Sequence, residues 1–204
     1  MQRPGKIVCV GRNYRDHAKE MGGDVPPEPL LFLKPPTSVI AGGAAIELPP
    51  GAGRIDYEGE IGVVVGATLR HADEAAAAKA IRGIVAANDV SARDWQKNDG
   101  QWARAKGCDT FLPLGPEAPA PADLSRLTVV TRHNGRETQR ATGGDMVFAI
   151  PFLLAYVSRY MTLEPGDLLL TGTPAGVAQV APGDSVEVEI VGVSRVSNPV
   201  VAGR

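Results

Sequence analysis

The chain has 204 residues, of which 44% are hydrophobic and 22% are charged, and its formal net charge at pH 7 is -2. This composition is typical of a globular protein, and the length suits one domain with a sizeable core. Because the net charge is near zero and no basic block is present, the sequence argues against binding to nucleic acid or to a membrane surface.

Three further features predict a cytoplasmic protein. The cysteines Cys9 and Cys108 form neither a CxxC pair nor a disulfide framework, so a reducing compartment is expected. The apolar run within residues 1–11 is too short for a signal peptide. The longest apolar run, residues 146–157, is too short to span a bilayer.

The N-terminal part of the chain is predicted to contain two strands and a short helix. Residues 6–10 form the first strand, and residues 30–33 resemble a buried strand. Between them, Asn13 can cap a helix that ends at Gly22-Gly23. Lys34 follows the second strand. Its side chain is either solvated at the end of the strand or places a positive charge in a site at the tip of the strand.

His17 and Glu20 lie three residues apart on the predicted helix. Residues with this spacing share a helical face and can form a hydrogen bond. A histidine oriented by a carboxylate is the minimal general-base pair. The alternative is a chance pair on a surface helix.

An acidic stretch at residues 54–65 ends in a β-branched run and is predicted to be a strand. Side chains alternate along a strand, so Asp56, Glu58 and Glu60 share one face, with roughly 6.6 Å between successive carboxylates. A bound cation would remove their mutual repulsion, whereas an exposed acidic edge strand would discourage aggregation. The valines that follow favour the metal slightly, because they indicate a buried strand and buried carboxylates need a partner.

The middle of the chain is predicted to form a helix at residues 71–83 and a buried strand at residues 84–90. Asp89 lies near the C-terminal end of that strand, where it can be either a functional group or a plain turn or capping residue.

A second short helix is predicted to open at residues 91–94, which have the capping-box pattern. Arg93 and Gln96 are three apart and share its face. The polar stretch at residues 98–109, which contains Lys106, is predicted to be a loop.

The second half of the chain continues the β-rich pattern. The expected elements are a hairpin at 127–140 turning at Asn134-Gly135, a helix at 147–160, and strands at 168–171, 185–190 and about 191–201. A turn at 172–177 contains Thr173 and could hold a carboxylate on its N–H groups, although a plain β-turn is the alternative. Strands outnumber helices by about two to one, which favours a sandwich or barrel-like core.

Taken together, these stretches resemble the fumarylacetoacetate hydrolase family over nearly the whole chain. The matching motifs, in the family's order, are Gly11-Arg12-Asn13-Tyr14 with His17 and Glu20, Phe32-x-Lys34-Pro35, Tyr57-Glu58-Gly59-Glu60-Ile61, the run from Asn88 to Gln96, Lys106 before Asp109-Thr110-Phe111, and two turns at 163–167 and 172–177. The chain is most similar to the short single-domain branch, which contains acylpyruvases, oxaloacetate decarboxylases, fumarylpyruvate hydrolases and keto-acid isomerases.

The resemblance implies a fold and an organisation. The fold is α+β and β-rich, a mixed β-sandwich roll with a few short helices. Residues 1–204 would form one catalytic domain, usually dimeric, and residues 11–29 would form an active-site lid.

The resemblance also implies roles for individual residues. The implied metal ligands are Glu58, Glu60 and Asp89, with Asp56 as a neighbour only. The implied catalytic residues are His17, Glu20 and Lys106. The implied substrate-binding residues are Arg12, Tyr14, Lys34, Arg93, Gln96 and Thr173. Three carboxylates with open coordination positions suit Mg²⁺ or Mn²⁺.

The predicted function is a divalent-metal-dependent hydrolase that cleaves a C–C bond in acylpyruvate-type 2,4-diketo acids, such as acetylpyruvate or fumarylpyruvate. The same site could decarboxylate oxaloacetate. The alternatives are an isomerase or decarboxylase of 2-hydroxymuconate-type intermediates in aromatic catabolism, and a non-catalytic family member that binds a keto acid. The expected partners are a small keto acid and a second copy in a homodimer, with no nucleic acid and no membrane.

Overall fold

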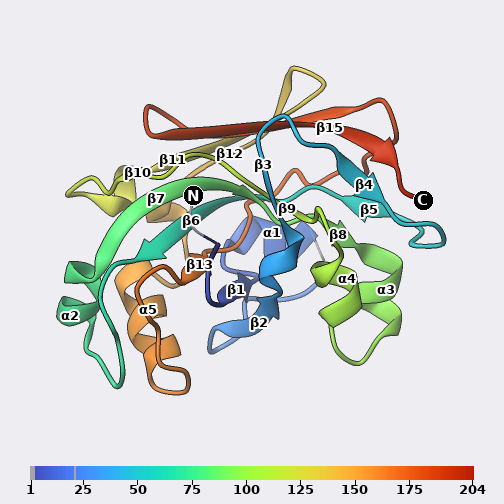
Figure 1. Ribbon diagram of the computed structural model, residues 1–204. Helices are drawn as coiled ribbons and strands as arrows, with labels where there is room; N and C mark the ends of the chain where they lie inside the picture. Colours follow the sequence, from blue (N-terminus) through green and yellow to red (C-terminus); the bar gives the residue numbers. More distant parts are fainter. Residues whose placement is uncertain (1–2, 21) are drawn as a thin grey trace.

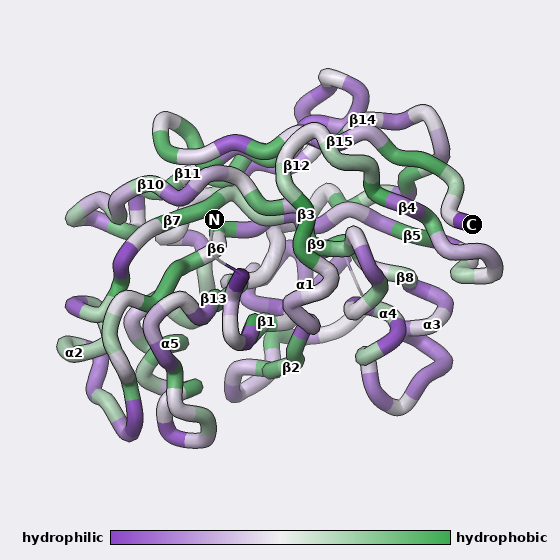
Figure 2. The backbone as a smooth tube through the Cα atoms, viewed as in Figure 1, coloured by the Kyte–Doolittle hydropathy of each residue, from purple (hydrophilic) through white to green (hydrophobic). Residues whose placement is uncertain are grey.

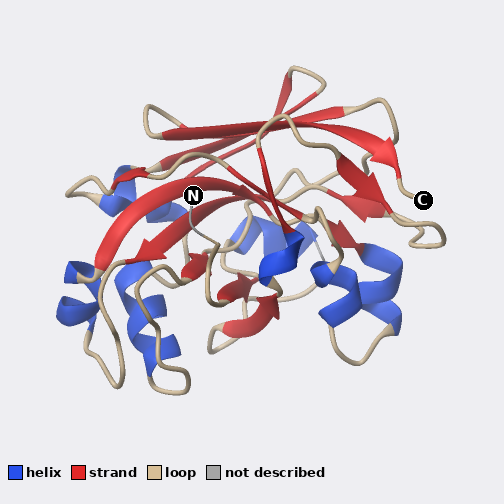
Figure 3. Ribbon diagram, viewed as in Figure 1, coloured by secondary structure: helices blue, strands red, loops and turns tan. Residues whose placement is uncertain are grey.

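The structure is a computed structural model that describes residues 3–20 and 22–204 (Figure 1). The predicted lid at residues 11–29 is therefore described except for Met21. Residues 1 and 2, at the start of the N-terminal apolar stretch, also lie outside the described residues. Within the described residues, the strands form two large sheets and one two-stranded ladder, and the helices are short (Figure 3). This architecture confirms the predicted β-rich fold class.

The first sheet is eight-stranded and mixed, and it carries the candidate site. Its strand order is β2 (Leu30–Lys34), β1 (Ile7–Gly11), β13 (Leu168–Leu170), β6 (Gly59–Val65), β7 (Ile81–Asn88), β9 (Leu112–Leu114) and β3 (Val39–Ala41), with β10 (Ala118–Pro119) paired to β7. The β1–β13 and β3–β9 pairs are parallel, and the other pairs are antiparallel.

The second sheet is five-stranded and lies across β6 and β7 (Figure 1). Its order is β12 (Arg136–Thr142), β11 (Thr128–His133), β14 (Ser185–Ile190), β15 (Ser194–Ala202) and β4 (Ile46–Leu48). The small ladder joins β5 (Ile55–Asp56) to β8 (Ser91–Ala92).

The helices lie around the first sheet. They are α1 (Arg15–Glu20), α2 (Glu74–Lys79), α3 (Arg93–Asn98), α4 (Ala103–Gly107) and α5 (Ile150–Ser158), with 3₁₀ turns η1 (Pro36–Ser38), η2 (Leu124–Arg126) and η3 (Gly143–Asp145). Helices α2 and α5 pack together at one end of the sheet, and α3 and α4 pack together at the other (Figure 1). Among the described helices, none has the length and apolarity that a membrane crossing requires.

Strand β6 is buried along its full length because both of its faces are covered. Ile61 and Val63 pack into the core shared with the second sheet and α5, whereas Val64 packs into a smaller core on the opposite face. A strand buried on both faces reads as a continuous apolar run, which explains the largely green course of β6 and β7 in Figure 2. The core therefore fixes the ends of β6 and β7, where the candidate site lies.

Several local predictions are confirmed. Asn134 and Gly135 have φ values of 51° and 79°, and they join β11 to β12 by the tight turn that an Asn-Gly pair favours. The predicted C-terminal helix corresponds to α5, with Pro151 in its first turn as expected.

Two predicted strands differ from the structure. Residues 54–65 do not form one strand, because the chain leaves the ladder at Tyr57 and Glu58, whose N–H groups donate to Ala178 O and to Asn88 Oδ1. Residues 30–33 are not a buried strand: β2 lies at the edge of its sheet, and Leu33 is 51% exposed.

Two helix predictions and one loop prediction are also wrong in detail. The helix at 71–83 ends at Lys79, because β7 already begins at Ile81. Ser91 does not cap α3, since it lies in β8 and its hydroxyl donates to Asp89 O. The stretch 98–109, predicted to be a loop, contains α4.

The turn before β14 is fixed by Asp184, and this gives a testable stability prediction. Its carboxylate accepts hydrogen bonds from Asn134 Nδ2 (2.8 Å) and Ala181 N (2.8 Å) and contacts His133 Nε2 (2.9 Å). The bond from Asn134 is the main cause that lowers the pKa of Asp184 to about 2. We expect Asp184→Ala to lower the free energy of unfolding at pH 7 by about 1–2 kcal/mol.

The pH dependence gives the control. A carboxyl whose pKa is lower in the folded state stabilises the fold above its unfolded pKa, and this stabilisation is lost as the pH falls through the folded pKa. The difference in urea unfolding between wild type and Asp184→Ala should therefore be full at pH 7 and should shrink as the pH falls from about 4 towards 2. An unchanged difference across that range would contradict this role.

Candidate metal centre

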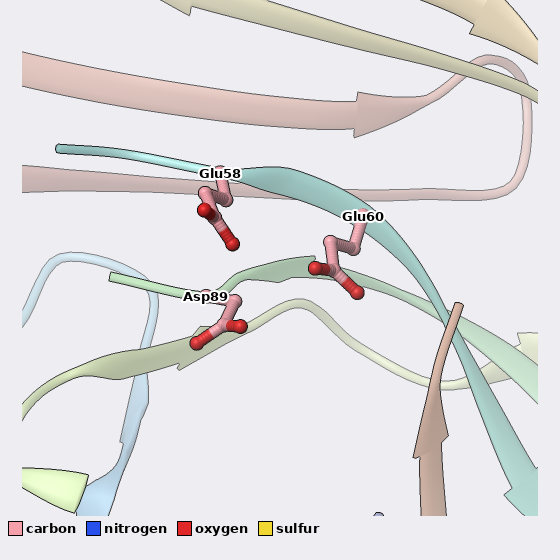
Figure 4. A group of neighbouring side chains, drawn as sticks. All are labelled: Glu58, Glu60 and Asp89. Carbon is pink, nitrogen blue, oxygen red and sulfur yellow. The ribbon is translucent and has the colours of Figure 1, made fainter. Parts of the chain in front are cut away.

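Three carboxylates meet where β6 begins and β7 ends. Glu58 precedes β6, Glu60 lies within it, and Asp89 directly follows β7. The antiparallel pairing of Gly59 with Asn88 brings these segments together. One oxygen from each carboxylate lies within 4.8 Å of the others, and Figure 4 shows the three side chains converging.

The three side chains are almost fully buried, so their charges require compensation. Glu58, Glu60 and Asp89 are 5%, 1% and 0% exposed. Taking a carboxylate out of water is costly unless a cation or several donors replace the water. The cluster therefore needs positive charge close by.

A glycine between the two glutamates allows the second sheet to approach the site. A Cβ on Gly59 would lie 1.9 Å from Thr131 Oγ1 on β11. Its N–H donates to Gln139 Oε1 (3.0 Å). Any side chain at this position would push β11 away from the strand that carries Glu60.

Protein cations already surround two of the carboxylates. Lys106 Nζ lies 2.7 Å from Glu58 Oε2 and 2.6 Å from Asp89 Oδ2. Lys34 Nζ lies 2.7 Å from Asp89 Oδ1. Arg93 Nη2 contacts Glu58 Oε1 at 2.7 Å as an ion pair, without the alignment of a hydrogen bond.

These charges act differently on the two glutamates. Burial raises the pKa of Glu58, but Lys106 and Arg93 outweigh burial and lower that pKa. Burial, followed by the like charges of Asp89 and Glu58, raises the pKa of Glu60 well above its usual value. The Gly172 N–H donates to Glu60 Oε2 (2.7 Å) without offsetting this rise. Of the two glutamates, Glu60 is therefore the one whose negative charge is offset less by nearby cations and hydrogen-bond donors.

The donor set fits a hard divalent cation. Three buried carboxylates supply oxygen ligands and leave coordination positions for water or substrate, as Mg²⁺ and Mn²⁺ prefer. Asp56 is not part of the cluster, because Arg54 Nε (2.7 Å) and Arg93 Nε (2.8 Å) already donate to its oxygens. Within the described chain, this is the one group of three or more such residues that could hold an ion.

A histidine and a glutamate on α1 face the same cavity. His17 Nδ1 lies 3.2 Å from Glu20 Oε2. Glu20 also accepts hydrogen bonds from Gly176 N at 3.1 and 3.3 Å. Asn13, predicted to cap this helix, instead bonds to Phe148 and Thr171, and so anchors the chain just before α1.

The cavity has a volume of about 640 Å³ and gathers most of the predicted site residues. Those that line it are Arg12, His17, Glu20, Glu58, Glu60, Arg93, Gln96, Lys106 and Thr173. Asp89 lies behind this wall, reaching the cluster from a fully buried position.

Two residues predicted to bind substrate lie outside the cavity wall. Tyr14 is 3% exposed and packs in the core, where its backbone pairs with Met146. Lys34 is 2% exposed because its ammonium group is bound to Asp89, Val90 O and Lys106 O. Neither residue lines the cavity in this structure, and the ammonium group of Lys34 contacts Asp89 instead.

The sequence did not indicate the partners that hold the 172–177 turn. Gln139 Nε2 donates to Thr173 Oγ1 (2.8 Å), and the Thr173 hydroxyl donates to Gly59 O (2.9 Å). Gln139 lies in the hairpin strand β12, and no sequence motif around it indicated that it contacts the site. The turn does bind carboxylates on its N–H groups, but they are the protein's own Glu60 and Glu20.

Lys34 gives a second stability prediction. We expect Lys34→Met to lower the free energy of unfolding by about 3–5 kcal/mol, because it leaves the buried Asp89 carboxylate with one cation fewer. Urea unfolding of the metal-free protein measures this loss, and Lys79→Met, at an exposed lysine of α2, is the control. A loss no larger than that of the control would show that Lys106 alone compensates Asp89.

Comparisons with known proteins agree with this architecture. A family model described as the C-terminal region of fumarylacetoacetate (FAA) hydrolase matches residues 6–201. The human protein named oxaloacetate tautomerase FAHD2A, mitochondrial, is 40% identical over an alignment that covers 98% of this chain and 67% of that protein.

Two solved structures are similar along almost the whole chain. One is a 5-carboxymethyl-2-hydroxymuconate delta-isomerase from Mycobacterium smegmatis, with a TM-score of 0.91 and 43% identity, covering 99% of this chain and 80% of that one. The other is a 2-hydroxyhepta-2,4-diene-1,7-dioate isomerase from Mycobacterium marinum, with a TM-score of 0.90 and 42% identity, covering 98% and 75%.

Proposed function

This chain belongs to the fumarylacetoacetate hydrolase C-terminal family, and from that premise we propose that it is a divalent-metal-dependent hydrolase of acylpyruvate-type 2,4-diketo acids. The observation that carries the proposal is the convergence of a His–Glu pair, a buried lysine and three carboxylates around one cavity. Acetylpyruvate and fumarylpyruvate are the candidate substrates, and decarboxylation of oxaloacetate is a candidate side reaction.

Glu58, Glu60 and Asp89 would hold Mg²⁺ or Mn²⁺, as their geometry and burial support. When bound, the ion would act as a Lewis acid towards the 2-oxo acid end of the substrate.

The His17–Glu20 pair would activate water. Glu20, held by the Gly176 N–H, orients the His17 ring, and His17 takes a proton from water. The resulting hydroxide attacks the distal acyl carbonyl, and the bond between that carbon and the neighbouring methylene breaks. The products are a carboxylic acid and the enolate of pyruvate, which regains a proton from the protonated His17.

Lys106 would stabilise the negative charge that develops on the leaving enolate. Lys106 lines the cavity and its side chain is 2% exposed, so water screens its charge little. Arg93 is held by Asp56 and by Gln96 Oε1 (2.9 Å), so its position is fixed before substrate arrives. Arg93, Gln96 and Thr173 would then orient the substrate's oxygens.

The second candidate function is an isomerase or tautomerase of oxo acids. It is favoured by the names of the human relative and of the two mycobacterial structures. In this reaction the same His17–Glu20 pair would move a proton between carbon and oxygen, without attack by water.

The wider organisation is also part of the proposal. Residues 11–29 would act as a lid, because α1 carries His17 and Glu20 and is attached to Gly176 by a hydrogen bond. The chain would work as one catalytic domain in a cytoplasmic homodimer with a small keto acid as its ligand.

A side-by-side assay tests the proposal. The purified protein is stripped of metal, reloaded with Mg²⁺ or Mn²⁺, and given acetylpyruvate, fumarylpyruvate and oxaloacetate, with a metal-only blank for spontaneous decarboxylation. We expect metal-dependent release of pyruvate from an acylpyruvate. Enol–keto interconversion of oxaloacetate without hydrolysis of either acylpyruvate would replace the proposal with the tautomerase.

A further inference from the structure

Part of the cavity wall is apolar, although most of the residues that line the cavity are charged or polar. Among the described residues, the apolar ones that line it are Val10, Gly11, Phe32, Trp102 and Val177. Phe32 and Trp102 are half-buried, and their ring centroids lie 5.3 Å apart in an edge-to-face arrangement with an interplanar angle of 68°. Aromatic rings in this arrangement attract each other and can accept a third apolar group against them.

Strand β2 leads from the carboxylate cluster to these rings. Side chains alternate along a strand, so Leu30, Phe32 and Lys34 lie on one face of β2, with about 6.6 Å between successive members. Lys34 Nζ lies 2.7 Å from Asp89 Oδ1 in the cluster, whereas Leu30 is 38% exposed. Phe32 therefore lies between the cluster and the protein surface.

The Phe32 ring also lies beside a group that contacts the cluster directly. Lys106 Nζ is 5.0 Å from the ring centroid of Phe32, and the same ammonium group lies 2.7 Å from Glu58 Oε2 and 2.6 Å from Asp89 Oδ2. Trp102 directly precedes α4, the helix that carries Lys106, and α4 packs against β2. A ligand anchored at the cluster thus has both rings within reach of its far end.

A glycine leaves space next to the rings. Gly11 pairs with Leu30 and so shares the face of Phe32. A Cβ on Gly11 would lie 3.2 Å from Leu30 Cδ2 and 3.6 Å from Trp102 Cζ3. The φ of Gly11 lies outside the left-handed region, so its backbone does not require glycine, and the missing side chain widens the cavity beside Trp102. Gly11, Phe32 and Trp102 together are called the apolar strip below.

The apolar strip suits an apolar group and disfavours a charged one. Gly11 and Phe32 have no side-chain hydrogen-bond donor, and Trp102 has a single N–H. A carboxylate placed against the strip would lose water and gain at most that one donor, which is costly, whereas an apolar group gains by leaving water. The cavity volume of about 640 Å³ is well above what acetylpyruvate fills, so a larger substituent can be accommodated.

We propose that the apolar strip binds the acyl substituent of the substrate, so that acylpyruvates with a bulky apolar acyl group, such as aroylpyruvates, are preferred to acetylpyruvate and fumarylpyruvate. This inference rests on the proposed function and specifies its substrate. With the 2-oxo acid end held at the carboxylate cluster, the substituent on the acyl carbon is the part of the substrate farthest from the cluster. Phe32 and Trp102 would then determine specificity and take no part in bond cleavage.

Three 2-oxo acids that cannot be hydrolysed, and that differ only in the group on C4, test the inference without turnover. 2-Oxo-4-phenylbutanoate has a phenyl group there, 2-oxopentanoate has a methyl group and 2-oxoglutarate has a carboxylate. Each is titrated calorimetrically into the Mn²⁺-loaded protein. We expect the wild type to bind the phenyl compound at least about 10-fold more tightly than either of the others, because only the phenyl group buries a large apolar surface.

Variants show whether the strip causes this preference. Trp102→Leu keeps an apolar side chain but removes the ring, and we expect it to reduce the preference for the phenyl compound about 5- to 10-fold. Binding of 2-oxopentanoate should stay within about threefold, which also shows that the variant is folded. Trp95→Leu is the matched control, because it removes the chain's other tryptophan, which lies on α3 and outside the cavity wall. Gly11→Ala is a smaller change that should also reduce the preference, since its methyl group would occupy the space beside Trp102.

Kinetics provide a second measurement. We expect kcat/KM to be higher for benzoylpyruvate than for acetylpyruvate in the wild type. Trp102→Leu should reduce this ratio through KM, with kcat little changed, because the strip binds the substituent equally in the ground state and in the transition state.

The possible outcomes separate the two levels of the proposal. If none of the three oxo acids binds, the oxo-acid site is refuted, and the role of the apolar strip with it. If 2-oxoglutarate binds most tightly, or if the phenyl preference survives both Trp102→Leu and Gly11→Ala, the oxo-acid site stands and the role of the strip is refuted. If the phenyl preference depends on Trp102 but no acylpyruvate is hydrolysed, the strip stands as a subsite of an oxo-acid tautomerase, and the hydrolase is refuted.

Discussion

Glu60→Gln should abolish divalent-metal binding and turnover together. Glu60 supplies one of the three clustered carboxylates, and a neutral amide is a far weaker ligand for Mg²⁺ or Mn²⁺. Loss of a residue that merely supports a ligand typically costs 10- to 100-fold in metal affinity, so loss of a ligand should cost at least 100-fold. At a fixed Mn²⁺ concentration we expect turnover to fall by about 1,000-fold or more.

Glu60 is a better position for this test than Glu58. Removing Glu58 would take one carboxylate partner from both Lys106 and Arg93, which confounds metal loss with structural damage. Glutamine at position 60 can still accept the hydrogen bond from Gly172 N. It also removes a carboxylate whose pKa is raised by burial and by like charges, so the metal-free variant should be at least as stable as wild type at pH 7.

Titration with Mn²⁺, followed by electron paramagnetic resonance, measures the affinity directly. Asp94→Asn is the control, because Asp94 is an exposed carboxylate on the same cavity wall and outside the cluster. We expect it to bind Mn²⁺ with near-normal affinity. If Glu60→Gln binds Mn²⁺ within about threefold of wild type, the three carboxylates are not the metal site.

His17→Ala should reduce hydrolysis by about 100- to 10,000-fold, the usual contribution of a positioned general base. His17 lies outside the carboxylate cluster, so the affinity for Mn²⁺ should change little. Glu20→Gln should have a smaller effect, because Glu20 only orients the ring and glutamine can keep one hydrogen bond to Gly176 N.

Two substrates show whether His17 acts by activating water. Decarboxylation of oxaloacetate requires no attacking water, so His17→Ala should impair it much less than hydrolysis of fumarylpyruvate. Lys19→Ala, at an exposed residue on the same helix, is the control for damage to α1. Full hydrolytic rate in His17→Ala would refute the general-base role.

The sequence by itself determined the features that depend on short spacing. The two-residue period of a strand placed Glu58 and Glu60 on one face, although the strand is interrupted just before Gly59. The three-residue spacing on a helix placed His17 beside Glu20. These relations hold because successive residues of a regular element have fixed directions, whatever the rest of the fold does.

Only the tertiary structure decided which distant groups meet. The β6–β7 pairing brings Asp89 close to Glu58. Lys34, at the end of edge strand β2, reaches Asp89 with its ammonium group. Gly176, 156 positions from Glu20 in the chain, supplies the N–H that holds it. Such contacts depend on strand order and on which buried charges must be neutralised together. Those are properties of the packed molecule, and no local spacing encodes them.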